Sequence, residues 1–142
     1  MKKILAFIII AVAIVLTVII YKYKTLENSA KQIQQLNTEF ENFSSGEIMG
    51  TSIITLINKS TDLNNKNNVS KDKEGYYIDN NKNSIQIEIK FLGSDKTFRM
   101  EDISNHGSEE FVKNYASAYF KCTERKYHES TKRIKYMSFE EI

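Results

Sequence analysis

The chain has 142 residues, with 20 lysines and arginines, 18 aspartates and glutamates, one cysteine and no proline. A single cysteine excludes an intramolecular disulfide framework, so the fold must depend on packing. Four basic residues precede residue 25 and every acidic residue follows it, so the remainder holds 16 basic and 18 acidic residues, a net charge of −2. Nucleic-acid binding needs a concentrated basic face, and we therefore expect no nucleic-acid partner.

The first predicted element is an apolar run over residues 4–21, flanked by Lys2 and Lys3 on one side and by Lys22 and Lys24 on the other. Eighteen residues of helix span about 27 Å, close to the roughly 30 Å hydrocarbon core of a bilayer. A cleaved secretory signal, the main alternative, has a shorter apolar core followed by small residues. Residues 1–24 are therefore predicted to be an uncleaved membrane anchor with basic flanks, and the lipid bilayer is the first expected partner.

The orientation of this anchor depends on what lies on each side of it. Lysines at both ends give only a small charge difference. A three-residue tail precedes the run and the whole domain follows it. We expect a single-pass protein of the cell membrane, with its N-terminus cytoplasmic and its C-terminal domain extracytoplasmic.

Residues 25–45 are predicted to continue the membrane helix as an amphipathic stalk. Apolar residues recur there at helical spacings of seven, three, four and three: Leu26, Ile33, Leu36, Phe40 and Phe43. Without proline, and without glycine before Gly46, nothing interrupts the helix. The stripe either packs on the chain's own domain, which is the simpler expectation, or forms a coiled coil with a partner.

Residues 46–142 form the predicted domain, which begins with a short helix over residues 50–59. Thr51 or Ser52 is expected to cap its first turn. Its apolar face is predicted to comprise Ile53, Ile54 and Ile57, with Leu56 at the margin, although the β-branched residues leave a strand as the alternative. Residues 61–74 are rich in asparagine and lysine and are predicted to be a polar surface loop.

The clearest strand covers residues 84–92, where one apolar face alternates with polar residues: Ile85, Ile87, Ile89 and Phe91. Residues 76–78 before it and residues 97–100 after it are expected to flank it, the latter through a turn at 93–96. Together they predict an antiparallel meander.

The segment 79–83 has the Asp-x-Asn-x-Asn beginning of a calcium-binding loop. Ser84 stands where such a loop needs glycine, and Lys90 where it needs a bidentate glutamate. This segment is therefore predicted to be a hairpin turn, and no metal ligand is assigned to it.

A helix over residues 109–115 and two strands over 119–127 and 133–139 complete the predicted domain. Ser108 is expected to cap the helix, and the residues expected to point inward are Phe111, Val112 and Tyr115. The expected fold class is α+β: an N-terminal transmembrane helix that continues into the stalk helix, packed on a small antiparallel sheet of about four or five strands.

Residues that could carry chemistry are few. Cys122 and His128 are six apart and could share a strand face, and His106 is a second possible base for the thiol. A zinc site needs two further ligands. Cys122 is more simply a small buried strand residue, His106 a residue of a surface turn, and Glu101 and Asp102 helix starters rather than an acid/base pair. No catalytic, cofactor-binding or metal-binding residue is assigned, and we expect a protein that is not an enzyme and uses no cofactor.

Six tyrosines are many for a small domain and could form an aromatic surface for a partner, although core or cross-strand packing is the alternative: Tyr76, Tyr77, Tyr115, Tyr119, Tyr127 and Tyr136. Residues 138–142 are expected to be the end of the last strand rather than a docking peptide. Phe139 and Ile142 are expected to pack there on the edge of the domain.

A basic start, one membrane helix that runs into a stalk and a small antiparallel sheet form a layout that resembles the type IV pilins, the pseudopilins and the TadE-like proteins of pilus and secretion systems. The segment over residues 46–57, GEIMGTSIITLI, is similar to a Gly-Ser/Thr-x-Val-Ile-x-x-Ile phrase in small anchored proteins of Gram-positive bacteria. Prepilins are cleaved after a glycine or alanine and carry a glutamate at the fifth mature position, whereas here Lys3 precedes an apolar run without acids. The resemblance therefore implies an unprocessed accessory subunit.

Two functions follow as hypotheses. The first is a structural or accessory subunit of a cell-envelope assembly, in contact with other envelope proteins through the stalk helix or the tyrosines. The second is a membrane-anchored extracytoplasmic domain that binds a ligand or peptide as a sensor.

Overall fold

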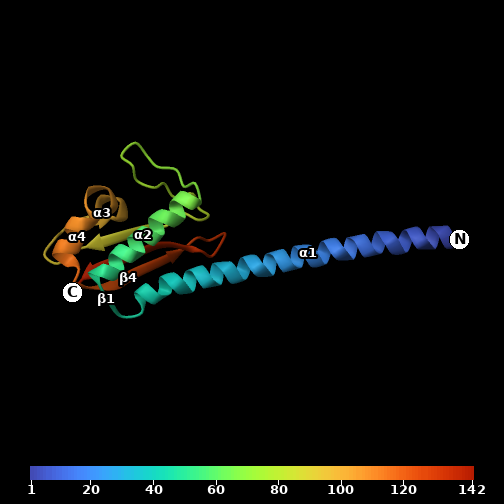
Figure 1. The fold of residues 1–142 in the computed structure, drawn as a ribbon, viewed down its shortest axis with the longest axis horizontal. Helices are drawn as coiled ribbons and strands as arrows, with labels where there is room; N and C mark the ends of the chain where they lie inside the picture. The colour runs from blue at the N-terminus through green and yellow to red at the C-terminus, as the bar shows by residue number, and fades with distance from the viewer. The chain divides into compact units, whose positions relative to one another are not determined.

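The computed structural model describes residues 1–142, except for the side chains of Lys2, Leu5 and His106. The fold class is α+β, as predicted (Figure 1). The chain divides into two compact units, Met1–Gln35 and Leu36–Ile142. In chain order its elements are α1 (Lys2–Glu41), the 3₁₀ helix η1 (Asn42–Ser44), β1 (Glu47–Met49), α2 (Gly50–Lys66), β2 (Gln86–Lys90), β3 (Thr97–Arg99), α3 (Met100–His106), α4 (Ser108–Tyr115), β4 (Tyr119–Tyr127) and β5 (Ile134–Glu141).

The first unit holds α1 up to Gln35, and this helix continues without interruption past the predicted anchor, as expected. Within the described part of the chain, it is the one helix long and apolar enough to cross a membrane, and its most apolar window has no buried residue. The hydroxyls of Thr25 and Ser29 donate to the carbonyls of Tyr21 and Thr25, each at 2.9 Å. Polar residues after the apolar run therefore bond back to the helix rather than end it.

The last turns of α1 belong to the second unit. Phe40 is fully buried, whereas Leu26, at the start of the predicted stripe, is 70% exposed. The Asn37 amide donates to the carbonyl of Lys132 at 2.7 Å and accepts the N–H of Ile134 at 2.9 Å, which ties the helix to β5. The stripe predicted over residues 25–45 therefore packs on the domain only through its later members: Leu36, Phe40 and Phe43.

The sheet has five strands in the order β1-β4-β5-β2-β3 and is mixed. Three pairings are antiparallel, as expected, but β2 and β5 are parallel. The segment 76–78, expected to flank β2, contributes only an isolated bridge between Tyr77 and Lys71. β5 pairs with β2 instead, and its Met137 and Phe139 lie beside Ile87 and Ile89 in the same core.

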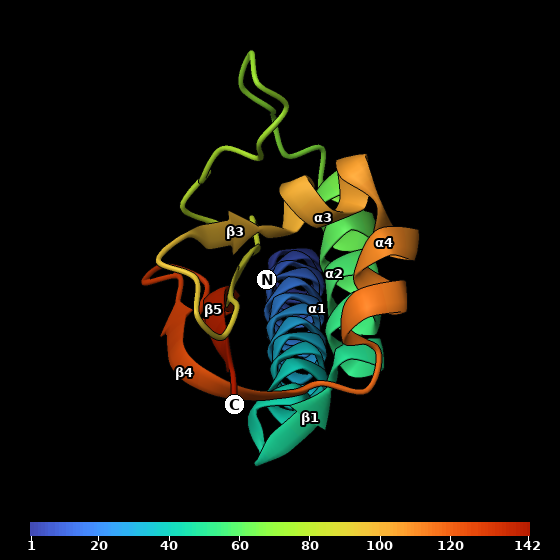
Figure 2. The same ribbon diagram turned by 90° about the vertical axis from the view of Figure 1, so that its left-hand side faces the viewer.

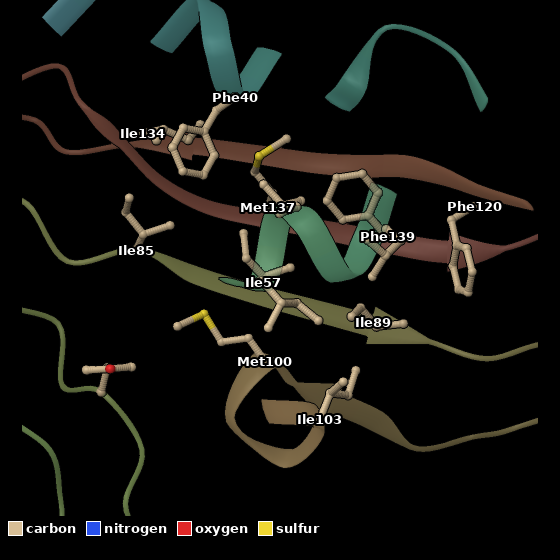
Figure 3. Close-up of a cluster of buried hydrophobic side chains, with 14 of the residues drawn as sticks. Phe40, Ile57, Ile85, Ile89, Met100, Ile103, Phe120, Ile134, Met137 and Phe139 are labelled. Carbon is tan, nitrogen blue, oxygen red and sulfur yellow. The ribbon is translucent and has the colours of Figure 1, made fainter. Parts of the chain in front are cut away.

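One face of the sheet is covered by helices. Figure 2 shows α2, α3 and α4 together on one side of β3, β4 and β5. Buried side chains from both layers fill the space between (Figure 3), among them Phe40, Ile57, Ile85, Ile89, Met100, Phe120, Ile134, Met137 and Phe139. The opposite face is bare, and one row across it alternates in charge, which favours cross-strand pairing: Glu47, Lys121, Glu140 and Lys90.

The start of α2 differs from the prediction, because neither Thr51 nor Ser52 caps it. Met49 is the N-cap residue and makes no side-chain capping bond. The N–H groups of Gly50 and Thr51 instead donate to the carbonyls of Ala118 and Ala116, at 2.9 and 3.4 Å. This close approach requires glycine, since a Cβ at Gly50 would lie 1.8 Å from a backbone oxygen of Tyr115.

The body of α2 is longer than predicted. Residues 61–66, expected in the polar loop 61–74, belong to the helix. Tertiary contacts override the polar composition here: the buried Asn64 amide donates to the carbonyl of Ile85 and accepts its N–H, both at 2.8 Å. On the apolar face, Leu56 is fully buried and Ile54 only partly, the reverse of the expected order.

Two further elements correct the sequence analysis. Strand β1 was not predicted, and the segment from Met100 is the helix α3 rather than the end of a strand. Glu101 and Asp102 occupy its first turn, as expected of helix starters. In α4 the N-cap is Gly107 instead of Ser108. Val112, expected to point inward, is 40% exposed.

Candidate functional site

A groove lined by aromatic side chains lies among β3, α3, α4 and the end of β2, with a volume of about 300 Å³. Its apolar walls are Phe91, Phe98, Ile103, Phe111 and Tyr115, and its polar lining is Asp102, Gly107, Glu110 and Asn114. We call this the aromatic groove. It was not predicted from the sequence.

The aromatic cluster follows from ordinary strand and helix periodicity. Phe91 continues the inward alternation of β2, and Phe98 of β3 pairs with Ile89. Phe111 and Tyr115 are four residues apart on α4 and therefore share a face. The rings of Phe91 and Tyr115 stack at 4.3 Å between centroids, and those of Phe91 and Phe98 meet edge to face at 5.1 Å. Phe120, labelled in Figure 3, contacts Phe91 and Phe111 and so joins this cluster to the core.

Two carboxylates give the aromatic groove its charge. Asp102 accepts the backbone N–H of Arg99 at 2.8 Å and the hydroxyl of Tyr76 at 2.6 Å. The hydrogen bond to Asp102 raises the pKa of the Tyr76 hydroxyl. Glu110 is exposed. No described side chain that lines the aromatic groove is basic. The Arg99 guanidinium lies nearby, 4.4 Å from the ring centre of Tyr76.

Gly107 separates α3 from α4 and lets this lining form. Its φ of +142° is one that side-chain-bearing residues rarely adopt, and a Cβ there would lie 3.2 Å from the Cβ of Glu110. Its N–H donates to the carbonyl of Ile103 at 3.2 Å, which ends α3. A glycine at this position therefore leaves room for the side chain of Glu110 at the start of α4.

Cys122 and His128 are held by different partners. Cys122 is half-buried against the core, and its thiol donates to the carbonyl of Glu124 at 3.5 Å. Burial raises the pKa of this thiol, which disfavours the thiolate that a nucleophile needs. His128 is fully buried beyond the end of β4, with Nε2 2.8 Å from the carbonyl oxygen of Ser84. The side chain of His106 lies outside the described residues.

The segment 79–83 forms a turn whose oxygens are already used, although residues 76–78 do not make it a hairpin. Asp79 accepts the N–H of Asn81 and the hydroxyl of Ser84, both at 2.9 Å, and pairs with Lys135. Burial acts to raise the pKa of Asp79, but the bonds from Lys135, Asn81 and Ser84 outweigh it and lower the pKa to about 2. His128 Nδ1 is 3.9 Å from the same carboxylate.

A second hollow of about 600 Å³ lies beside this turn, at the β4–β5 hairpin. Several of its polar groups have partners within the domain: Lys126 pairs with Glu124 at 3.0 Å, Lys135 pairs with Asp79, and the Ser130 hydroxyl donates to the carbonyl of Asn81 at 2.9 Å. Among the described residues, no group of three or more His, Cys, Asp or Glu is placed to hold a metal ion. We therefore consider the aromatic groove the better candidate.

Most of the predicted tyrosine surface is used inside the domain. Four hydroxyls donate to side chains at 2.6–2.7 Å: Tyr76 to Asp102, Tyr77 to Asn65, Tyr127 to Glu41 and Tyr136 to Glu88. Tyr119 is 49% exposed. Of the six tyrosines, only Tyr115 lines the aromatic groove.

Glu101 and the end of the chain also have structural contacts. Glu101 is buried and accepts the N–H of Tyr77 at 2.9 Å, whereas Asp102 accepts the hydroxyl of Tyr76 and lines the aromatic groove. The two carboxylates therefore do not form an acid/base pair. Phe139, expected on the edge of the domain, is fully buried in the core, because β5 is the central strand of the sheet. Glu141 accepts the N–H of Leu92 at 2.9 Å. Ile142, expected to pack on the edge, is 52% exposed.

Two local signals in the sequence concern the residues of the aromatic groove. Phe91 and Phe98 flank a turn, and Phe111 and Tyr115 lie one helical turn apart, but the sequence does not reveal that α4 packs against α3 and Phe91. Compared with known proteins, the chain matches no family model, no curated protein and no solved structure. Its function therefore has to be inferred from the geometry.

Proposed function

We propose that the chain is a single-pass, membrane-anchored, non-enzymatic subunit of a cell-envelope assembly, similar in layout to accessory subunits of pilus or secretion systems. The observation that carries the proposal is the contrast within α1. The side chains around Ile10 and Ile14 are exposed, in a run long enough to span a bilayer, while the same helix ends buried at Phe40. A helix of this kind fits a domain that works at a membrane surface.

The orientation proposed is N-terminus cytoplasmic and domain extracytoplasmic. In a Cys122→Ser background, a cysteine introduced at the exposed Lys73 tests it. A membrane-impermeant maleimide should label Lys73→Cys on intact cells, whereas Lys3→Cys should react only after lysis. The reverse pattern would place the domain inside.

A binding role, rather than catalysis, is supported by how the possible catalytic groups are used. The Cys122 thiol has a raised pKa and a backbone partner. His128 is buried against Ser84, and the carboxylate of Asp79 is engaged by Lys135 and Ser84. Each of these groups supports the packing of the domain.

Photocrosslinking in native membranes tests the assembly. A photoreactive residue at Gln35, the exposed last residue of the first unit, should capture a defined envelope protein or a ladder of self-adducts. The matched control is the same photoreactive residue at Lys90, on the bare face of the sheet. Lys90 lies there beside Glu140 of the neighbouring strand, and we expect no partner protein at this position. Capture of nothing from any position on the domain or helix, with a monomeric protein, would contradict the proposal.

A membrane-anchored ligand- or peptide-binding sensor is the second candidate, and the concave aromatic groove favours it. A photoreactive residue at Asn114, which is exposed and lines that groove, separates the two functions. Crosslinking of a soluble peptide or small molecule to this position would favour the sensor. Crosslinking of an envelope protein would favour the assembly subunit.

A further inference from the structure

We propose that the aromatic groove binds a short cationic and apolar peptide segment of a partner protein, with a lysine or arginine of that segment over the aromatic rings and beside Glu110. The proposal rests on the proposed function, since it names the contact by which the anchored domain recognises its envelope partner. Three features of the groove carry it: its rings, its charge and its size.

The rings offer faces that bind cations. Phe91, Phe98 and Tyr115 are half-buried at the groove, and an ammonium or guanidinium group is attracted to an aromatic face. Elsewhere the domain already uses this contact: Arg99 lies 4.4 Å from the ring centre of Tyr76, and Lys126 lies 4.8 Å from that of Tyr136. Among the described residues, no basic side chain of the domain occupies the rings of the groove in this way.

The acidic side chains of the groove favour a bound segment that carries a positive charge. Asp102 and Glu110 both line the groove. Asp102 accepts hydrogen bonds from the Arg99 N–H and the Tyr76 hydroxyl, which hold its carboxylate in place. Two acidic side chains beside aromatic rings, with no basic side chain among the described lining residues, favour a cationic segment over an acidic one.

The size and the edge of the sheet define how the segment binds. A volume of about 300 Å³ is at the small end of ligand sites and accommodates a few side chains, not a folded surface. Strand addition to the outer edge of β3 is hindered, because Asp102 already accepts the N–H of Arg99. The bare face of the sheet is a poorer site for a cation, since Lys121 and Lys90 stand there beside Glu140. Recognition therefore depends on side chains placed in the groove.

Peptide binding to the full chain in phosphatidylcholine nanodiscs tests the proposal. The probe is a fluorescently labelled Phe-Lys-Leu-Lys-Phe peptide with blocked ends, read by anisotropy. A peptide with glutamate in place of lysine, or one with serine and glycine in place of the apolar residues, should bind about tenfold more weakly. The reason is that the charge of the lysines and the contact of the apolar side chains both contribute to binding. Equal binding of all three peptides, or no binding of the first, would overturn the proposal.

Variants locate the contact. Glu110→Gln should weaken binding of the lysine peptide by about two- to fivefold, as expected for a partly exposed ion pair, and Glu110→Lys by about tenfold. Glu109→Gln is the matched control: it removes an acid from the same first turn of α4 but not from the groove, and binding should stay within about twofold. Both glutamates are exposed, so folding is retained. Equal losses from Glu109→Gln and Glu110→Gln would contradict the groove.

Capture in native membranes separates this proposal from the proposed function. If Gln35 captures an envelope protein but Glu110→Lys leaves capture from Asn114 unchanged, the partner binds elsewhere, and the groove proposal fails while the assembly stands. If the lysine peptide binds through Glu110 but no envelope protein is captured, the assembly fails while the groove chemistry stands. Self-adducts through Asn114 would identify a second copy as the occupant and overturn the commitment to a different partner protein.

Discussion

The two units of the chain use apolar side chains in opposite ways. In the first unit, Phe7 is 74% and Ile14 59% exposed, whereas in the second unit Phe40 and Phe139 have no exposed surface. Exposed apolar area costs about 25 cal/mol per Å² in water. The apolar surface of the first unit is thus compatible with an apolar solvent, and that of the second unit is covered by the chain's own sheet and helices.

Polar groups differ between the units in the same way. In the first unit they bond within one helical turn, as in the Lys31–Glu27 pair at 2.7 Å. The second unit has local bonds too, but several of its polar groups also join segments far apart in the sequence, as Asn64 does with Ile85. The first unit therefore depends on local bonds and its surroundings, and the second on its tertiary structure.

The largest expected effect comes from charging the apolar run. Ile10→Arg combined with Ile14→Arg should remove the protein from the membrane fraction, because two arginines near the middle of a membrane helix cost about 6 kcal/mol on insertion scales. The matched control is Leu26→Arg with Gln32→Arg, both exposed positions of α1 beyond the run. Alkaline carbonate extraction measures the change. Loss of membrane binding in both double variants would mean that the run is not the anchor.

The next effect compares two phenylalanines of one helix. Phe40→Ala should lower the free energy of unfolding of the domain by about 3–5 kcal/mol, because it leaves a cavity beside Ile134 and Met137. Phe7→Ala, at the other end of α1, should leave it unchanged. Denaturant unfolding in detergent measures both. A comparable loss from Phe7→Ala would show that the first unit contributes to the packing of the domain.

Much of the fold could be predicted because its signals are local. The run over residues 4–21, the alternation at 84–92 and the final pair of strands each show a period of one element in a short window. The parallel pairing of β2 with β5 has no local signal, since it depends on residues about fifty positions apart. The end of α2 was missed for the same reason, because Asn64 is helical through its bond to Ile85.

Gly50 takes part in a tertiary contact, with the backbone of Tyr115, that the sequence alone does not indicate. Gly50→Ala should destabilise the domain by about 1–3 kcal/mol, the range for overpacking, since the added Cβ would overlap a backbone oxygen of Tyr115. Thr51→Ala, at the residue predicted to cap α2, should cost less than about 0.5 kcal/mol, because its side chain caps nothing. Thermal unfolding of both variants measures the difference. A larger loss at Thr51 would restore the predicted cap.

The candidate site was less predictable than the fold. Cys122, His128 and Asp79 are the residue types that carry chemistry, but their partners in the structure are supplied by tertiary contacts. The aromatic groove is made of Phe91, Phe98, Phe111 and Tyr115, which read in the sequence as core residues. They form a surface because α4 packs against α3 and places Phe111 and Tyr115 against Phe91, and no short stretch of sequence contains all of these residues.

The smallest effect concerns Asp79, whose bonds to Ser84 and Lys135 join the 79–83 turn to β5. Its folded-state pKa of about 2 lies below the value of 3.8 for an unperturbed aspartate, so its ionised form stabilises the domain above about pH 4. That stability is lost as the pH falls through the folded-state pKa. Because the side chain is 30% exposed, solvent screening reduces the contribution to about 1 kcal/mol.

Asp79→Asn should therefore be less stable than the parent protein at pH 7, with a difference that shrinks toward pH 2. Asp95→Asn, in an exposed turn, should show no such trend in denaturant unfolding. A difference at Asp79 that stays constant from pH 7 to pH 2 would mean that the ionised carboxylate does not hold the turn against β5, and that shape alone maintains this contact.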